Sequence, residues 1–215
     1  MFYITVWGKA AERWDDDTVL DNLYALSDSM TLIDELISLL QYRYDQLDFI
    51  DEPVDLGFEC PLDLHCTYTR DQLLVAMDFM KPATVREGVK WLPEKQLDVF
   101  FVTLNKSDKD YSPTTMYNDY SINETLFHWQ SQSTTAADSP TGQRYIHHRD
   151  KGTKVLLFVR EFKSDRITNG AEAYTYLGTA NYVMHTGSKP MNITWHLDRP
   201  IPAKFLKKTN KLVVG

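Results

Sequence analysis

The apolar residues of the first ninety positions recur at helical spacing, whereas those of the later positions alternate with polar residues or form short runs. Stripes over 19–26, behind an acidic N-terminal run, and over 32–47 have the period of amphipathic helices. Thr31-x-x-Asp34 resembles a capping box at the start of the second stripe. A third helix is predicted to begin at Thr69, where Thr-x-x-Gln forms a clearer box, and to end before Lys81-Pro82.

From about residue 89 the pattern is that of β-strands. Runs rich in Val, Tyr, Phe, Thr and Trp predict the strands 97–104, 126–132, 143–148, 154–162, 174–184 and 191–197. Asp150–Thr153 is typical of a hairpin turn, and His185–Pro190 of a second turn. Short strands with glycine turns and no helical pattern between them predict a barrel or a tightly curled sheet. We therefore expect an α+β protein, with a helical region over 1–90 packed on a β-barrel-like domain over 91–215.

The composition is that of an ordinary globular protein, with 215 residues, 43% hydrophobic and 25% charged. The chain contains neither a run of about 18 apolar residues nor a basic, apolar and small-residue leader, so we expect a cytoplasmic protein without a membrane partner. Cys60 and Cys66, with His65 beside them, lack the spacing of a zinc site. We expect buried thiols and no metal there.

The net charge of −7 is the sum of two unlike halves. Residues 1–100 contain 20 Asp and Glu against 8 Lys and Arg, whereas residues 101–215 contain 10 against 15. Such asymmetry indicates a polyanion-binding part joined to a different module. We expect any DNA contact to be made by residues beyond about 100.

Polar and aromatic side chains are densest around the strand predicted at 126–132. Alternation places two sets of side chains on opposite faces of this strand. The sets are Phe127, Trp129 and Ser131 on one face and His128, Gln130 and Gln132 on the other. Amide side chains can contact base edges, and aromatic rings can stack on an unpaired base. A barrel strand with a solvated polar face has the same pattern, so both interpretations stay open.

Residues from about 60 to 200 resemble the C-terminal domain that follows a phospholipase-D-like nuclease and a superfamily 2 helicase in many bacterial proteins. The matching motifs are Val102–Ser107, Tyr111–Tyr120, Leu126–Ser133, Thr141–Tyr145, Leu157–Glu161, Tyr174–Gly178 and Pro190–Trp195. In SauUSI-type modification-dependent (type IV) restriction enzymes, the domain in this position is the target recognition module, similar to SRA domains that flip a modified cytosine out of the duplex. The segment before residue 60 resembles a helical coupler to the helicase.

The resemblance implies an SRA-like (PUA-like) curled β-barrel that reads 5-methylcytosine or 5-hydroxymethylcytosine in double-stranded DNA, with helicase and nuclease domains in cis or in trans. A flipped base needs aromatic faces, an acidic acceptor for the cytosine amino group and a polar edge reader. Asp119, between Tyr117 and Tyr120, has the chemistry of that acceptor, and Trp129 or Tyr145 could supply a second ring face. The candidate base- or DNA-binding residues are Tyr117, Asp119, Tyr120, His128, Trp129, Gln130, Gln132, Arg144 and Tyr145.

We expect no catalytic residues and no cofactor in this chain, because it contains neither a phosphate-binding Gly-rich loop nor a His-x-Lys pair. Enzymatic activity is expected on the associated nuclease and helicase. One alternative is a module that couples to a helicase without reading bases. A second is a Mg²⁺-dependent nuclease built on Glu161-x-Lys163 with Asp150 or Asp138. His147 and His148 are expected to lie exposed beside the predicted hairpin turn.

Overall fold

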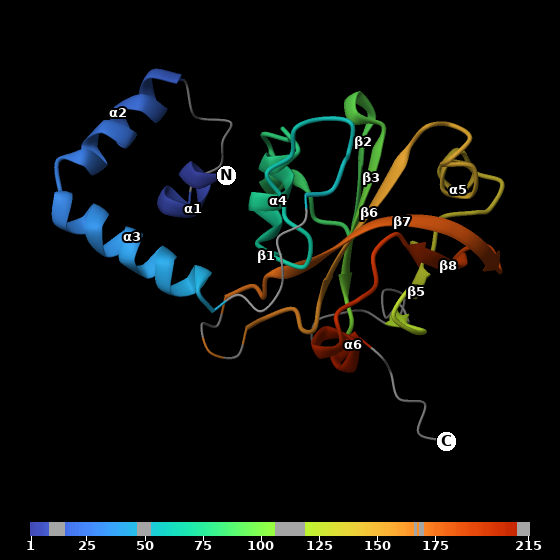
Figure 1. The fold of residues 1–215 in the computed structure, drawn as a ribbon. Helices are drawn as coiled ribbons and strands as arrows, with labels where there is room; N and C mark the ends of the chain where they lie inside the picture. The colour runs from blue at the N-terminus through green and yellow to red at the C-terminus, as the bar shows by residue number, and fades with distance from the viewer. Residues whose placement is uncertain (9–15, 47–52, 106–118, 166, 168–169, 210–215) are drawn as a thin grey trace.

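The computed structural model describes residues 1–8, 16–46, 53–105, 119–165, 167 and 170–209. Figure 1 labels most of its helices and strands. The helices are α1 (Phe2–Trp7), α2 (Asp16–Ser27), α3 (Met30–Tyr44), α4 (Arg70–Ala76), α5 (Pro140–Ile146) and α6 (Ala203–Thr209), with short 3-10 turns at Pro82–Thr84 and Pro93–Lys95. The strands are β1 (Thr67–Tyr68), β2 (Val89–Leu92), β3 (Leu97–Thr103), β4 (Tyr120–Ser121), β5 (Leu126–Gln130), β6 (Lys154–Arg160), β7 (Tyr174–Thr186) and β8 (Asn192–Leu197).

The strands form one eight-stranded sheet in the order β2-β3-β6-β7-β8-β5-β4, with β1 paired to β7. Only the β3–β6 pair is parallel among these ladders, and the connection between these two strands carries β4, β5 and α5. The chain is therefore an α+β protein, as predicted. The ladders of the described residues leave the sheet open, with β2 and β4 at its two ends, so, of the expected barrel or curled sheet, it is not a closed barrel.

The sheet curls instead of closing. Two register shifts in β7, one opposite Leu156 and Phe158 and one near Tyr182, mark bulges that bend the long strand. Gly178 lies at the first bulge with a φ of +88°, a backbone conformation that favours glycine. The bend brings β5 to face β3, where the rings of Phe100 and Trp129 stack with centroids 4.1 Å apart. The far strands thus meet through side chains in the core rather than through backbone hydrogen bonds.

Each face of β3 and β6 packs against its own core. One core, inside the curl, joins β3, β5, β6, β7 and β8, and its largest members are Phe100, Phe127, Trp129, Tyr145 and Trp195. The second core packs α4 and the segment around Leu56 and Leu62 against the outer face of β3, β6 and β7. Residues before position 90 therefore contribute one strand and much of a core to the sheet. The proposed division into 1–90 and 91–215 stays a prediction.

Local signals decide where two of the helices begin. The capping box predicted at Thr69 is confirmed: the Gln72 backbone N–H donates to the Thr69 hydroxyl, and the Thr69 N–H donates to the Gln72 amide oxygen. The box predicted at Thr31 is wrong, because α3 begins at Met30 with Ser29 as its N-cap. Thr31 therefore lies inside the first turn, where its hydroxyl is not at the capping position.

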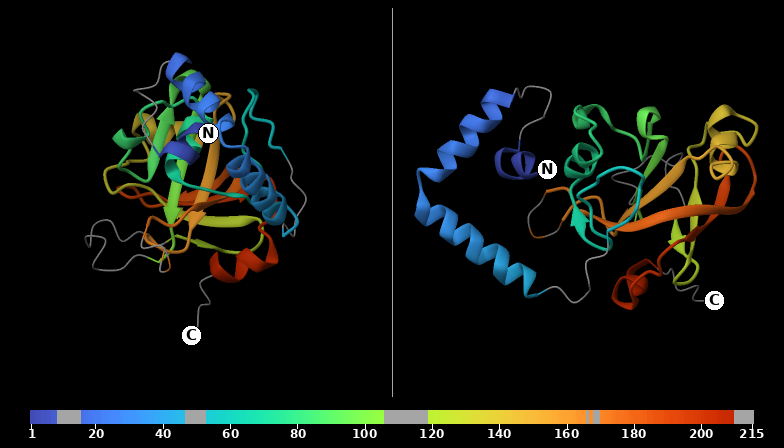
Figure 2. Two further views of the ribbon diagram at one scale, coloured as in Figure 1. Left: turned by 90° about the vertical axis from the view of Figure 1, so that its left-hand side faces the viewer. Right: turned by 45° about the horizontal axis from the view of Figure 1, so that its top comes forward.

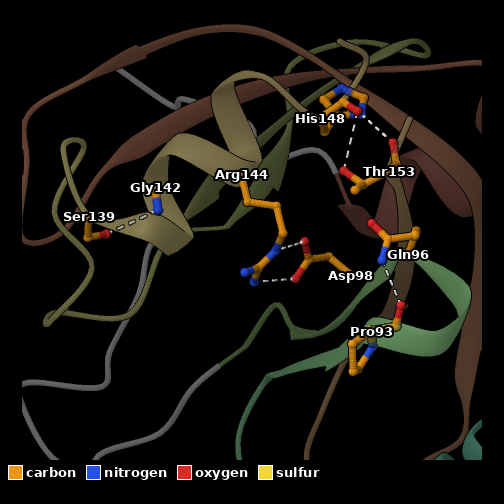
Figure 3. A network of polar contacts seen from close by, with 8 residues as sticks. All are labelled: Pro93, Gln96, Asp98, Ser139, Gly142, Arg144, His148 and Thr153. Atoms are coloured by element: carbon orange, nitrogen blue, oxygen red, sulfur yellow. Dashed lines mark hydrogen bonds and ion pairs between the residues drawn. The ribbon is translucent and has the colours of Figure 1, made fainter. Parts of the chain in front are cut away.

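The strand predicted over 143–148 is wrong, because residues 143–146 belong to α5 and the next two form a turn. The Gly142 backbone N–H donates to the Ser139 hydroxyl at 3.1 Å, so Ser139 caps the N-terminus of the helix (Figure 3). Pro140 occupies the first turn, where proline favours the start of a helix. The turn at Asp150–Thr153 consequently joins a helix to β6 and is not a hairpin. The second predicted turn, over His185–Pro190, is confirmed as the connection between antiparallel β7 and β8.

The three N-terminal helices lie on the side of α4 away from β8, as two further views show (Figure 2). α1 contacts α4 through a hydrogen bond of 2.7 Å from the Gln72 amide to the Thr5 hydroxyl. The Asn22 amide on α2 donates to the Tyr3 hydroxyl on α1 at 2.7 Å. Among the helices that the structure describes, none is long and apolar enough to span a membrane.

Candidate functional site

The alternation predicted along β5 is confirmed. Phe127 and Trp129 are buried in the core inside the curl, whereas His128 and Gln130 are only partly buried on the opposite face. Ser131, just after the strand, is fully buried, as its predicted face requires. The sheet therefore presents a row of polar side chains on the face of β5 that points away from the core.

Four of the candidate residues come together where β4 pairs with β5. Tyr120 lies opposite His128 in the ladder, and their rings stack with centroids 4.8 Å apart at an interplanar angle of 13°. The buried Asp119 carboxylate accepts the backbone N–H of Gln130 at 2.9 Å. The Gln130 amide in turn donates to the Asn192 side-chain oxygen on β8 at 3.1 Å. We call these five residues the β4–β5 cluster.

Trp129 and Tyr145 lie in the core rather than at the β4–β5 cluster. Trp129 is only 4% exposed and stacks on Phe100, and Tyr145 is 1% exposed with its ring edge-on to Phe100 at 5.3 Å. Burial raises the pKa of the Tyr145 hydroxyl. Because both rings are covered on their faces by other core residues, neither is placed to supply the second aromatic face expected for a base.

Arg144 pairs with an internal carboxylate. Its Nε and Nη2 donate to the two carboxylate oxygens of Asp98 at 2.7 and 2.9 Å, and its guanidinium lies 4.2 Å from the ring centre of Trp91 (Figure 3). Asp98 is fully buried on β3. Burial raises the pKa of Asp98, and the two hydrogen bonds from Arg144 oppose that rise. The pair therefore ties α5 to β3, a structural role that the sequence pattern did not indicate.

The remaining two candidates lie apart from the β4–β5 cluster or outside the described residues. The Gln132 amide donates a short hydrogen bond to the Glu87 carboxylate, just before β2. Tyr117 falls in the segment 106–118, outside the residues that the structure describes. The structure thus gathers Asp119, Tyr120, His128 and Gln130 from the candidate set.

A polar hollow of about 320 Å³ lies elsewhere, beside the first bulge of β7. The Asp198 carboxylate there accepts hydrogen bonds from the Thr179 hydroxyl and the Asn181 amide, and Asn181 accepts one from Nε of Arg149 at 3.0 Å. None of the predicted site residues lines this hollow. The available signal was the polar pair Thr179 and Asn181, which follows Gly178 in β7.

His148 borders the same hollow and is buried, so its expected exposure beside a hairpin turn is wrong. Nε2 of His148 accepts the Tyr182 backbone N–H at 3.0 Å, and Nδ1 of His148 lies 3.2 Å from the Thr153 carbonyl oxygen. This arrangement requires a neutral ring with the proton on Nδ1. Burial lowers the pKa of His148 and outweighs the influence of the neighbouring charges and hydrogen bonds on that pKa.

The stability of the protein is therefore expected to fall as the pH drops below about 6.5, the ordinary pKa of histidine. In that range the unfolded chain binds a proton at His148 and the folded chain does not, so acid favours unfolding. Urea unfolding between pH 7 and pH 5 measures this loss. A His148→Gln variant should show a shallower pH dependence, and an equal slope in both proteins would contradict the assignment.

The two cysteines are half-buried and form no disulfide with each other. Burial raises the pKa of the Cys60 thiol to about 11, so that thiol stays protonated at neutral pH. Among the described residues, no three His, Cys, Asp or Glu side chains are grouped as a metal site would require. Glu161 and Lys163, from the nuclease alternative, follow the end of β6.

A family model described as a domain of unknown function, DUF3427, matches residues 62–208. The matched range includes every strand of the sheet and the whole β4–β5 cluster, whereas α1, α2 and α3 precede it. No curated protein matches the chain.

Proposed function

The chain belongs to the DUF3427 family of domains of unknown function, and from this premise we propose that it is a DNA-binding module that reads a modified cytosine for a restriction or helicase–nuclease system. The observation that carries the proposal is the β4–β5 cluster. It combines a stacked aromatic pair, two amides and a carboxylate on neighbouring strands. These are the groups that recognition of an unstacked base requires.

Each part of the cluster has a distinct task in this proposal. The stacked rings of Tyr120 and His128 form a platform that a flipped base extends, because every base has an aromatic face. The amides of Gln130 and Asn192 offer donors and acceptors to the base edge. Asp119 is buried, and its carboxylate accepts the Gln130 backbone N–H, so in this proposal it positions Gln130 beside the base.

The choice of a modified cytosine comes from the resemblance to the target recognition module of SauUSI-type enzymes and to SRA domains. The most specific motif of that resemblance, Leu126–Ser133, is the same strand that contributes His128 and Gln130 to the cluster. In this proposal the curled open sheet is the SRA-like, PUA-like scaffold, and the helicase and nuclease act from associated domains. The excess of basic residues beyond position 100 favours contact with phosphates in that half.

The proposal predicts a preference for modified DNA that depends on the cluster. In fluorescence anisotropy, duplexes with 5-methylcytosine or 5-hydroxymethylcytosine should bind more tightly than the unmodified duplex, and the affinity should fall steeply with salt. His128→Ala and Tyr120→Ala should each reduce the preference about tenfold, because stacking on an aromatic ring contributes about 1–3 kcal/mol per base.

His147→Ala is the matched control, since His147 is an exposed histidine at the C-terminal end of α5 and is not part of the cluster. This variant should keep the wild-type preference. Equal affinity of the wild type for modified and unmodified duplexes would overturn the proposal that the domain recognises a modified cytosine. An absence of binding even at low salt would overturn DNA binding altogether and favour the helicase-coupling alternative.

A further inference from the structure

The helices α2 and α3 present an apolar surface that the rest of the described chain does not cover. No residue of α3 is buried, and Ile37 and Leu40 are 59% and 65% exposed. On α2, Tyr24 is 69% exposed. The large apolar side chains that remain exposed on the two helices are Leu20, Leu23, Tyr24, Met30, Leu32, Ile37, Leu39, Leu40, Tyr42 and Tyr44. We call this set the α2–α3 surface.

Most of the exposed residues gather on one side of each helix. At about 100° per residue, Leu32, Ile37, Leu39 and Leu40 fall on one side of α3, whereas Tyr42 falls outside it. The same spacing places Leu20, Leu23 and Tyr24 together on α2. Figures 1 and 2 show both helices at the outside of the molecule, beyond α1 and α4 as seen from the sheet. Contiguous exposed apolar surface of this kind marks an interaction site in soluble proteins.

The acidic character of α2 and α3 indicates the chemistry of a partner that would fit this surface. Between positions 16 and 45 the chain has seven acidic residues and one basic residue, Arg43. By the same helical spacing, Asp34 and Glu35 lie on the two flanks of the apolar side of α3, and Arg43 falls within it. An apolar surface with an acidic border complements an apolar surface with a basic border, and like charges at such a contact are unfavourable.

This charge argues against two other occupants. A second copy would bring its own acidic α2–α3 surface against the first. Other large exposed apolar residues among the described residues, such as Ile167, Val183 and Met184, lie outside α2 and α3. An anionic membrane would repel the acidic border, since interfacial helices carry Lys and Arg on their polar face.

We propose that the α2–α3 surface docks a separate protein element, an amphipathic helix or helical groove with an apolar centre and a Lys- and Arg-rich border. This contact lies outside the matched DUF3427 range and is independent of the DNA-binding proposal. The helices would supply apolar contact area, and the acidic residues would select a basic partner and speed its association.

A pair of synthetic helical peptides of the length of α3 tests the proposal with the full chain. One peptide has a leucine face and a lysine face, and the other has a leucine face and a glutamate face. The Leu/Lys peptide should bind in calorimetry or anisotropy, with an affinity that falls as salt rises. The Leu/Glu peptide should not bind.

Ile37→Glu with Leu40→Glu should reduce the binding of the Leu/Lys peptide at least about tenfold, since each change places a charge in the centre of the contact. Asp34→Asn with Glu35→Gln should lower the affinity at low salt and flatten its salt dependence. Val183→Glu, at an exposed apolar position on β7, should leave binding unchanged. Circular dichroism and melting temperature should stay near wild type in all variants, because exposed substitutions change stability by only about 0.5 kcal/mol.

Several results would overturn the proposal. Equal binding of both peptides, or of neither, would remove the charge selectivity on which it rests. Sedimentation that shows a dimer lost on Leu40→Glu would assign the surface to a second copy, and binding to phosphatidylglycerol vesicles lost on the same change would assign it to lipid. Because the α3 variants should bind DNA like wild type, failure here is distinguishable from failure of the DNA-binding proposal.

Discussion

Arg144→Ala is expected to destabilise the fold by about 3–5 kcal/mol, the loss typical of removing one partner of a buried ion pair. The Asp98 carboxylate is fully buried. Each of its two oxygens accepts a hydrogen bond from the Arg144 guanidinium. Without the guanidinium, β3 retains a buried carboxylate that must stay charged without a partner or take up a proton. The guanidinium also packs on Trp91, so the loss includes apolar contact area.

Urea unfolding monitored by circular dichroism measures this effect. Arg149→Ala is the matched control, because Arg149 follows the same helix but is exposed, and its removal should change stability by less than about 0.5 kcal/mol. Replacing both partners, Asp98→Leu with Arg144→Met, should recover much of the loss, since the buried charge is then gone. A loss below about 1 kcal/mol for Arg144→Ala would show that the pair does not hold α5 to the sheet.

Trp129→Ala is expected to cost about 3–5 kcal/mol of stability, whereas His128→Ala, one residue earlier, should cost less than about 1 kcal/mol. Trp129 packs among Phe100, Tyr145 and Trp195 inside the curl, so its removal leaves a cavity between strands that are far apart in the sheet order. His128 lies on the opposite face, against Tyr120.

Thermal and urea unfolding of the two variants provide the comparison, and DNA binding of each provides the second readout. The proposed function requires opposite outcomes: Trp129→Ala weakens the fold, and His128→Ala weakens the preference for a modified base. A stable Trp129→Ala protein that had lost this preference would instead place Trp129 in the recognition site. It would contradict the packing described above.

Patterns that depend on neighbours along the chain predicted the structure well. The faces of β5 follow from strict alternation, because successive side chains of a strand point to opposite sides. The helix start at Thr69 follows from a capping box whose two hydrogen bonds lie within four residues. α5 was missed although its signal, Ser139-Pro140, is equally local, because the aromatic and polar mixture that follows it is also compatible with a strand.

Apart from α5, the sequence by itself determined the main helical and strand-rich segments, the charge difference between the halves, and which residues of β5 face the core. It did not determine that Arg144 pairs with Asp98, that Trp129 stacks on Phe100, or that the sheet stays open. Those features join residues distant in sequence, and their positions depend on the strand order and on bulges in β7. Only the tertiary structure therefore divided the candidate residues into two groups. Trp129, Arg144 and Tyr145 support the fold. Asp119, Tyr120, His128 and Gln130 lie together at the β4–β5 cluster.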